Sequence, residues 1–139
     1  MRALLFAAGE GRRMRPLTQI LPKPLIQVGG IPMAVRQILA LRKAGITEIV
    51  VNAAHGARIL MAELGDGSAW GVKLLWSIEG FSTEDALETR GGIVRALPLL
   101  GRAPFIAVAG DIVTDFDYST LVRRAETLSP AGSLSLIHI

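Results

Sequence analysis

Three separated stretches of the chain carry residues that suit phosphate and metal chemistry. The first is the turn Gly9-Glu10-Gly11, which is followed by three arginines within four positions. The second is Lys23, which stands between two prolines, and the third is Asp111, which follows Gly110. Because they combine backbone N–H groups, cations and one carboxylate, these stretches predict the binding of a negatively charged ligand rather than attack by a protein nucleophile.

The Gly-x-Gly turn is predicted to bind an anion through its backbone. The apolar run over residues 3–6 indicates a buried strand that ends at this turn. Glycine permits positive φ and close approach of the backbone to a ligand, and the arginines add planar donors matched to phosphate. A dinucleotide fingerprint would need glycine where Met14 stands, and the Gly-Lys-Ser/Thr of a P-loop is absent. The local sequence leaves open an ordinary strand-to-helix connection with solvated arginines.

Lys23 and Asp111 are the candidate charged groups of the same site. The prolines around Lys23 restrict the backbone, so its ammonium is presented at one place, although a surface lysine is an open alternative. Asp111 follows an apolar strand, where a carboxylate is costly without a cation, and Mg²⁺ commonly binds one or two carboxylates plus phosphate oxygens and water. Asp115 and Asp117 are expected to be solvated or to cap the next helix.

The elements that must position these residues alternate between strand and helix. Short apolar and β-branched runs predict strands over 3–6, 47–52, 72–76 and 104–109, and helical spacing predicts helices over 32–44, 57–64, 91–97 and 121–128, with Pro98 ending the third helix. This order predicts an α/β fold with three layers and a mainly parallel sheet. Residues 77–89 have no clear period and are expected to form a loop in which Glu79 is one of the loop charges.

The carboxyl ends of the strands are the expected place for a ligand in such a sheet. The first loop, the loop after Trp76 and the Gly110-Asp111 corner all follow strands. We therefore expect them to form one crevice. Within the second loop, Glu88 and Thr89 precede a helix start, where free N–H groups can border a ligand.

Composition narrows the partners and the compartment. The 139 residues have a net charge of +3 and 5% aromatic residues, which favours anionic ligands but not a stacking platform for nucleic acid. The absence of cysteine excludes disulfides, thiolate catalysis and cysteine-bound zinc. The apolar run at the N-terminus is too short for a signal peptide or a membrane span, so we predict a cytoplasmic protein with no membrane partner.

The end of the chain is predicted to differ in origin from the rest. Residues 1–133 are assigned to the folded domain. Residues 134–139 match one reading frame of a widely used transposase sequencing adaptor, which predicts a non-native tail. A fifth strand is the alternative, since the segment is apolar.

With these stretches in view, the chain resembles the sugar-1-phosphate nucleotidyltransferase family. The resemblance lies in Ala7–Thr18, in Pro22-Lys23-Pro24-Leu25 and in Gly110-Asp111. It implies the nucleotide-binding, N-terminal part of a Rossmann-like domain of the nucleotide-diphospho-sugar transferase type. It also implies transfer of a nucleotidyl group from an NTP, with UTP favoured, to a sugar 1-phosphate such as the N-acetylmuramate 1-phosphate of peptidoglycan recycling.

The resemblance also implies roles for individual residues. Arg15 and Lys23 would be catalytic, and Asp111 would bind Mg²⁺. The nucleotide would be bound by Ala8, Gly9, Gly11, Arg12, Arg15, Glu88 and Thr89. Two alternatives stay open, a molybdenum-cofactor type of nucleotidyltransferase and a catalytically silent nucleotide-binding module; Arg90 and Ala109 depart from the family pattern and favour the second. A homo-oligomer is also left open.

Overall fold

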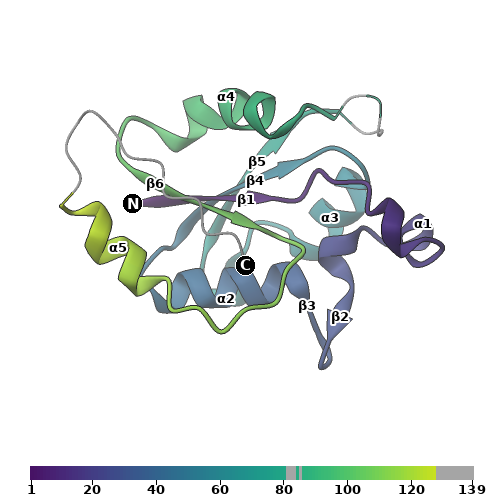
Figure 1. Cartoon of the computed structure of the whole chain (residues 1–139), viewed down its shortest axis with the longest axis horizontal. Helices are drawn as coiled ribbons and strands as arrows, with labels where there is room; N and C mark the ends of the chain where they lie inside the picture. Colours follow the sequence, from purple (N-terminus) through teal and green to yellow (C-terminus); the bar gives the residue numbers. More distant parts are fainter. Residues whose placement is uncertain (81–83, 85, 128–139) are drawn as a thin grey trace.

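A four-stranded parallel sheet forms the centre of the protein. The computed structural model describes residues 1–80, 84 and 86–127. The sheet has the order β5-β4-β1-β6, with β1 at Arg2–Phe6, β4 at Glu48–Ala53, β5 at Lys73–Ile78 and β6 at Phe105–Ala109. In the register, Leu4 of β1 lies opposite Val50 of β4 and Ala107 of β6. The predicted parallel sheet is therefore confirmed, and the carboxyl ends of all four strands lie at one edge (Figure 1).

Helices cover both faces of the sheet, which gives the predicted three layers. Helices α2 (Met33–Lys43), α3 (Ala57–Leu64) and α5 (Ser119–Ala125) pack on one face, and α4 (Thr89–Leu100) lies on the other (Figure 1). Successive residues of a strand point to opposite faces. Accordingly, Leu5 belongs to the larger core beneath α2, whereas Leu4 packs with Ala96 and Leu100 of α4. Burial on both faces explains why β1 reads as a continuous apolar run.

Short elements between β1 and α2 complete the edge where the strands end. They are two 3₁₀ turns, η1 (Arg12–Met14) and η2 (Lys23–Leu25), the single-turn helix α1 (Leu17–Ile20), and the antiparallel hairpin of β2 (Gln27–Val28) and β3 (Ile31–Pro32). A further 3₁₀ turn, η3 (Ser68–Trp70), precedes β5. The two-residue strands of the hairpin are too short to give a periodic pattern, so the sequence did not predict them.

The predicted end of α4 at Pro98 is wrong. The helix begins at Thr89, two residues before the glycines that were expected to open it, and continues through Pro98 to Leu100. Proline removes one backbone hydrogen bond in a helix interior. The last turn nevertheless buries Leu100 in the core beneath α4, and the N–H of Gly101, at φ +80°, donates to the carbonyl of Leu97. Burial of Leu100 and this glycine end offset the lost bond.

The last described helix also differs from its predicted range. It spans Ser119–Ala125 rather than 121–128. Asp117 explains the earlier start, since its Oδ1 accepts hydrogen bonds from the N–H and the hydroxyl of Ser119 at 3.0 and 2.6 Å. These bonds hold the pKa of Asp117 below its usual value and order the turn before the helix. The expected capping role of Asp117 is wrong, because Tyr118 is the N-cap residue and the helix has no side-chain cap bond.

The predicted tail over 134–139, with its alternative of a fifth strand, lies outside the described residues. Within the described part of the chain, no helix has the length and apolar character needed to cross a lipid bilayer.

Candidate functional site

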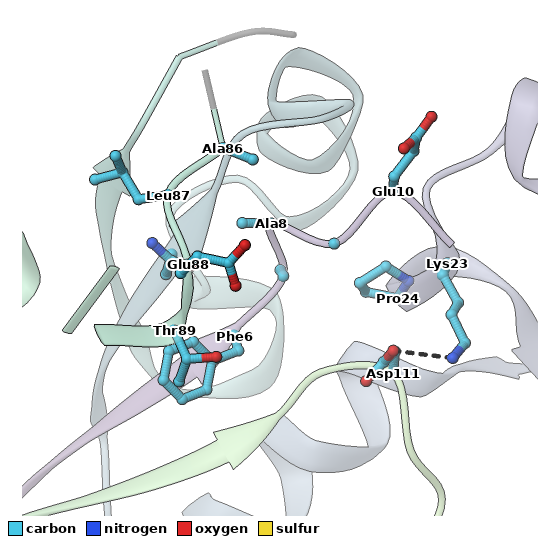
Figure 2. A pocket seen from close by; sticks show the side chains of 13 residues that line it. Phe6, Ala8, Glu10, Lys23, Pro24, Ala86, Leu87, Glu88, Thr89 and Asp111 are labelled. Carbon is cyan, nitrogen blue, oxygen red and sulfur yellow. Dashed lines mark ion pairs between the residues drawn. The ribbon is translucent and has the colours of Figure 1, made fainter. Parts of the chain in front are cut away.

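A pocket of about 410 Å³ opens at the carboxyl ends of the strands. Its walls come from the ends of β1 and β4, from η2, from the segment before α4 and from the corner after β6. Figure 2 shows the Ala86–Thr89 segment on one side and Lys23 with Asp111 on the other. The predicted meeting of the three loops in one crevice is confirmed. The lining residues are Phe6, Ala7, Ala8, Gly9, Glu10, Lys23, Pro24, Asn52, Ala86, Leu87, Glu88, Thr89 and Asp111.

The predicted site residues divide into two groups. Six of them line the pocket, namely Ala8, Gly9, Lys23, Glu88, Thr89 and Asp111. Gly11, Arg12 and Arg15 lie outside the lining and connect to it through Glu10. The geometry therefore brings the two sides of the predicted site together, while the roles of its residues stay predictions.

The two glycines of the first turn have different surroundings. Gly11 has φ +65°, its carbonyl accepts a 2.7 Å hydrogen bond from the Thr18 hydroxyl, and a Cβ atom there would lie 2.7 Å from Cγ2 of Thr18. The fold itself therefore requires glycine at position 11. A Cβ atom at Gly9 would meet no heavy atom within 4 Å, and Gly9 lines the pocket. The fold therefore does not require glycine at position 9, and only a ligand in the pocket could require it.

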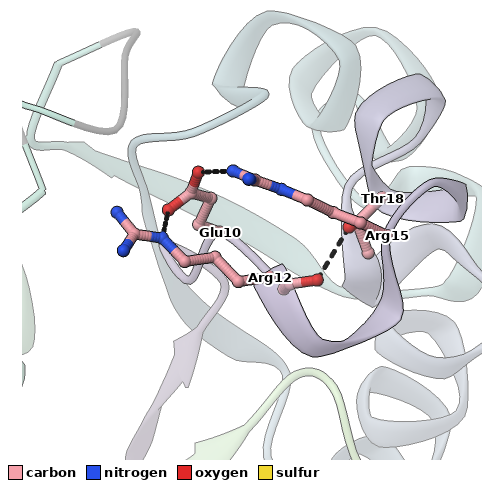
Figure 3. Close-up of polar contacts among 5 residues, drawn as sticks. Glu10, Arg12, Arg15 and Thr18 are labelled. Atoms are coloured by element: carbon pink, nitrogen blue, oxygen red, sulfur yellow. Dashed lines mark hydrogen bonds and ion pairs between the residues drawn. The ribbon is translucent and has the colours of Figure 1, made fainter.

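Glu10 joins two of the three arginines of the loop, a contact that sequence reasoning missed. Its two carboxylate oxygens pair with Nε of Arg12 and with a terminal nitrogen of Arg15 (Figure 3). The hydrogen bond from Arg12, followed by the charges of Arg12 and Arg15, lowers the pKa of Glu10. Glu10 also lines the pocket, so both arginines are paired with a pocket residue although neither lines the pocket itself. The only signal in the sequence was the clustering of one acid among three arginines.

Lys23 and Asp111 form an ion pair across the pocket wall. Nζ of Lys23 lies 3.0 Å from Oδ2 of Asp111 (Figure 2). On the lysine side, the N–H of Leu25 donates to the carbonyl of Pro22 at 2.9 Å, which closes the η2 turn. On the aspartate side, the N–H of Gly110 donates to the carbonyl of Phe6 at 2.8 Å. A Cβ atom at position 110 would lie 2.7 Å from that carbonyl oxygen, so only glycine permits this approach.

Glu79 lies in the predicted loop after β5, and its carboxylate makes two bonds that the sequence did not predict. One carboxylate oxygen of Glu79 accepts a 2.6 Å hydrogen bond from the amide of Asn52, and the other accepts from the backbone N–H of Leu87 at 2.6 Å. Asn52 is buried and lines the pocket. Glu79 therefore fastens the Ala86–Thr89 wall to the sheet. Sequence reasoning missed both residues because their partners come from separate elements.

The donor set around Asp111 fits magnesium only in part. Among the residues that the structure places, no three histidine, aspartate or glutamate side chains gather as a metal site. Asp111 supplies one partly exposed carboxylate that faces the pocket. Since Mg²⁺ is often bound by one or two carboxylates together with substrate phosphates and water, this single carboxylate suits an ion that arrives with a phosphorylated ligand.

The protein is an α/β protein with a parallel sheet covered on both faces. A glycine turn, a lysine and an aspartate surround one pocket at the carboxyl edge of that sheet. The chain matches the nucleotidyl transferase family over residues 2–138, and it belongs to that family.

Two curated relatives show the range of this similarity. The chain is 48% identical to the N-acetylmuramate alpha-1-phosphate uridylyltransferase of Neisseria meningitidis, over 92% of this chain and 54% of the relative. It is 32% identical to the mannose-1-phosphate guanyltransferase of Candida albicans, over 96% of this chain and 37% of the relative. The chain thus spans about half the length of the first relative and less of the second.

The solved structures agree on the fold. The structure of HddC from Yersinia pseudotuberculosis, complexed with GMP-PN, superposes with a TM-score of 0.76 at 22% identity. The superposition covers 91% of this chain and 54% of that one. At this identity the likeness establishes the shared architecture alone.

Proposed function

We propose that this protein transfers a nucleotidyl group from an NTP to a sugar 1-phosphate, with UTP and N-acetylmuramate 1-phosphate as the substrates. The observation that carries the proposal is the meeting of Lys23, Asp111 and the Gly9 turn around one pocket. The 48% identity to an N-acetylmuramate alpha-1-phosphate uridylyltransferase supports the choice of base and sugar.

The reaction needs charge neutralisation and positioning more than a covalent nucleophile. An oxygen of the sugar phosphate attacks the α-phosphorus of the NTP in line, the bond from that phosphorus to the bridging oxygen breaks, and pyrophosphate leaves. Negative charge is spread over the phosphate oxygens in such a transfer. We assign the neutralisation of this charge to Lys23, because Lys23 lines the pocket and lies in a turn that flanking prolines restrict.

The first loop is assigned to the leaving phosphates. The backbone from Ala8 to Gly9 lies open to the pocket, and Gly9 leaves room for close approach of a phosphate. Arg12 and Arg15 already lie side by side on the carboxylate of Glu10. A phosphate can replace that carboxylate as their partner, since guanidinium groups pair with both in the same planar geometry.

Asp111 is assigned to Mg²⁺, which, when bound, would neutralise phosphate charge beside Lys23. The ammonium of Lys23 and the metal ion would then compete for the carboxylate of Asp111. Glu88 and Thr89, on the opposite wall, are assigned to the nucleoside side of the ligand.

The alternatives are less well supported. Both curated relatives above are named as sugar-1-phosphate nucleotidyltransferases rather than as silent modules or molybdenum-cofactor enzymes. Arg90, which departs from the family pattern, is exposed on α4 and does not line the pocket, and neither does Ala109. Neither of these two residues therefore obstructs the pocket.

A pyrophosphate-release assay tests the proposal. Each of the four common NTPs is combined with a panel of sugar 1-phosphates, using the 139-residue chain and any longer product of its gene. The expected result is release that requires both Mg²⁺ and a sugar 1-phosphate and is fastest with UTP and N-acetylmuramate 1-phosphate. Nucleotide binding without release under every condition would instead support a silent module.

A further inference from the structure

One turn of α2 contacts the backbone on both sides of the Lys23–Asp111 ion pair. The N–H of Met33, at the start of α2, donates to the carbonyl of Ile26 at 3.0 Å, just after the η2 turn that carries Lys23. The side-chain amide of Gln37 donates to the carbonyl of Ile112 at 3.0 Å, just after Asp111. Met33 and Gln37 are four positions apart, so they lie on the same side of the helix.

Gln37 is an unusual residue for its position. It is 2% exposed and lies among the apolar residues by which α2 packs on the sheet. Its amide oxygen accepts a 2.5 Å hydrogen bond from the hydroxyl of Tyr118, which is 5% exposed. A buried amide is costly unless its donor and acceptor are both bonded, and here each has a partner in the segment that follows β6. Gln37 therefore ties that segment to α2 at two points.

Hydrogen bonds hold the backbone on each side of Asp111. Before it, Gly110 is bonded to the carbonyl of Phe6 in β1. After it, the carbonyl of Ile112 is bonded to Gln37. Further along, the ring of Phe116 packs edge-on against Tyr118, with centroids 5.6 Å apart. The residue that presents the carboxylate to the pocket thus lies between a contact to the sheet and a contact to α2.

We propose that Gln37, with Tyr118, is a positioning residue that sets where the Asp111 carboxylate stands relative to Lys23 and to a metal ion in the pocket. The consequence for catalysis rests on the function proposed above, whereas the structural role does not. Gln37 reaches the pocket only through the backbone of Ile112 and does not line it.

The structural role is tested by proteolysis of Gln37→Met, which keeps the length and apolar packing of the side chain but removes both hydrogen bonds. Chymotrypsin cuts after aromatic residues, and Phe116 and Tyr118 lie in the tied segment. We expect cleavage there to be about tenfold faster than in the unaltered chain, because local opening becomes easier. Gln27→Met, the same change at an exposed residue of β2, is the control and should cleave at the original rate. Equal rates in all three proteins would overturn the proposal.

The functional consequence is tested by the Mg²⁺ dependence of turnover. We expect Gln37→Met to raise the half-saturating Mg²⁺ concentration about tenfold, equivalent to about 1.4 kcal/mol, and to recover much of its kcat at saturating Mg²⁺. A residue needed only for folding would lower the active fraction at every Mg²⁺ concentration and leave half-saturation unchanged, and that result would also overturn the proposal.

Two further arrangements keep the outcomes distinct. If Gln37→Met does not fold, Tyr118→Phe tests the same chain of bonds, since it removes one hydroxyl and retains the ring against Phe116. Faster chymotrypsin cleavage of this segment in Tyr118→Phe supports the proposal, and an unchanged cleavage rate overturns it. If the unaltered protein shows no turnover with any NTP and sugar phosphate, the proposed function fails, and the proteolysis still decides whether Gln37 positions the Asp111 segment.

Discussion

The ammonium of Lys23 lies 3.0 Å from the carboxylate of Asp111, although one belongs to a turn before the hairpin and the other to the corner after the last strand of the sheet. The two side chains are 30% and 38% exposed. An ion pair exposed to this degree contributes only about 0–1 kcal/mol to stability. Changes to either residue should therefore alter ligand chemistry far more than folding.

Asp111→Asn should abolish Mg²⁺-dependent turnover and leave the thermal midpoint within a few degrees of the original. The amide keeps the size of the side chain but loses the charge that attracts the ion. Turnover at varied Mg²⁺ and a thermal melt measure the two quantities. Unchanged turnover would remove Asp111 from the metal site, and a collapsed melting temperature would mean that the pair serves the fold instead.

Lys23→Ala should lower kcat/KM by about 100-fold or more, because the ammonium meets charge that develops in the transition state. Lys73→Ala is the matched control, since Lys73 is exposed at the beginning of β5, at the opposite end of the strand from the pocket. Steady-state kinetics on both variants measures the difference. A loss below about threefold in Lys23→Ala would identify Lys23 as an ordinary surface lysine.

Gly9→Ala and Gly11→Ala should separate binding from folding. At Gly11 the positive φ and the approach of Thr18 should cost about 1–3 kcal/mol in the free energy of unfolding. At Gly9 the free energy of unfolding should change by less than about 0.5 kcal/mol, whereas NTP affinity should fall about tenfold. Denaturant unfolding and calorimetric titration with UTP measure both effects. Equal NTP affinity in Gly9→Ala would place the phosphates away from this turn.

Glu10→Gln should tighten the binding of inorganic pyrophosphate by about three- to tenfold at low salt, because a carboxylate that competes for two arginines is removed. Glu63→Gln, at an exposed position of α3, serves as the control. Calorimetric titration at low and high salt measures the affinity. Weaker binding in Glu10→Gln would show that Glu10 orients the arginines for the phosphate rather than competing with it.

Tyr118 should ionise above the usual pH for tyrosine. Burial raises the pKa of its phenol, and the hydrogen bond to Gln37 opposes this in part. The folded state favours the neutral phenol of Tyr118, so burial of this neutral side chain stabilises the fold fully below about pH 10. This stabilisation is lost as the pH rises above that value and the phenol ionises. Tyr118 is the only tyrosine of the chain, so tyrosinate absorbance during a pH titration reports it directly. A midpoint at or below that of free tyrosine would contradict its burial.

Local pattern was sufficient for most of the architecture. Apolar runs such as 3–6 and the helical spacing over 32–44 each record burial within a few residues, so strands, helices and their alternation follow from neighbours in the chain. The α/β alternation then predicts a parallel sheet, and the parallel sheet places every loop that follows a strand at one edge. That reasoning predicts that the Gly9 turn, the loop after Trp76 and the Gly110-Asp111 corner meet in one crevice.

Only the tertiary structure determined which residues far apart in the chain form hydrogen bonds with one another. Glu79 with Asn52, and Gln37 with Ile112, depend on strand register, on the rotation of a helix on the sheet and on burial, none of which a short stretch of sequence records. Pro98 shows the same limit for a local rule, since burial of Leu100 outweighs the propensity of proline to end a helix. The sequence by itself determined which residues could do chemistry and at which edge they lie. The packed fold decided which of them hold one another in place, because those contacts join elements that are far apart in the chain.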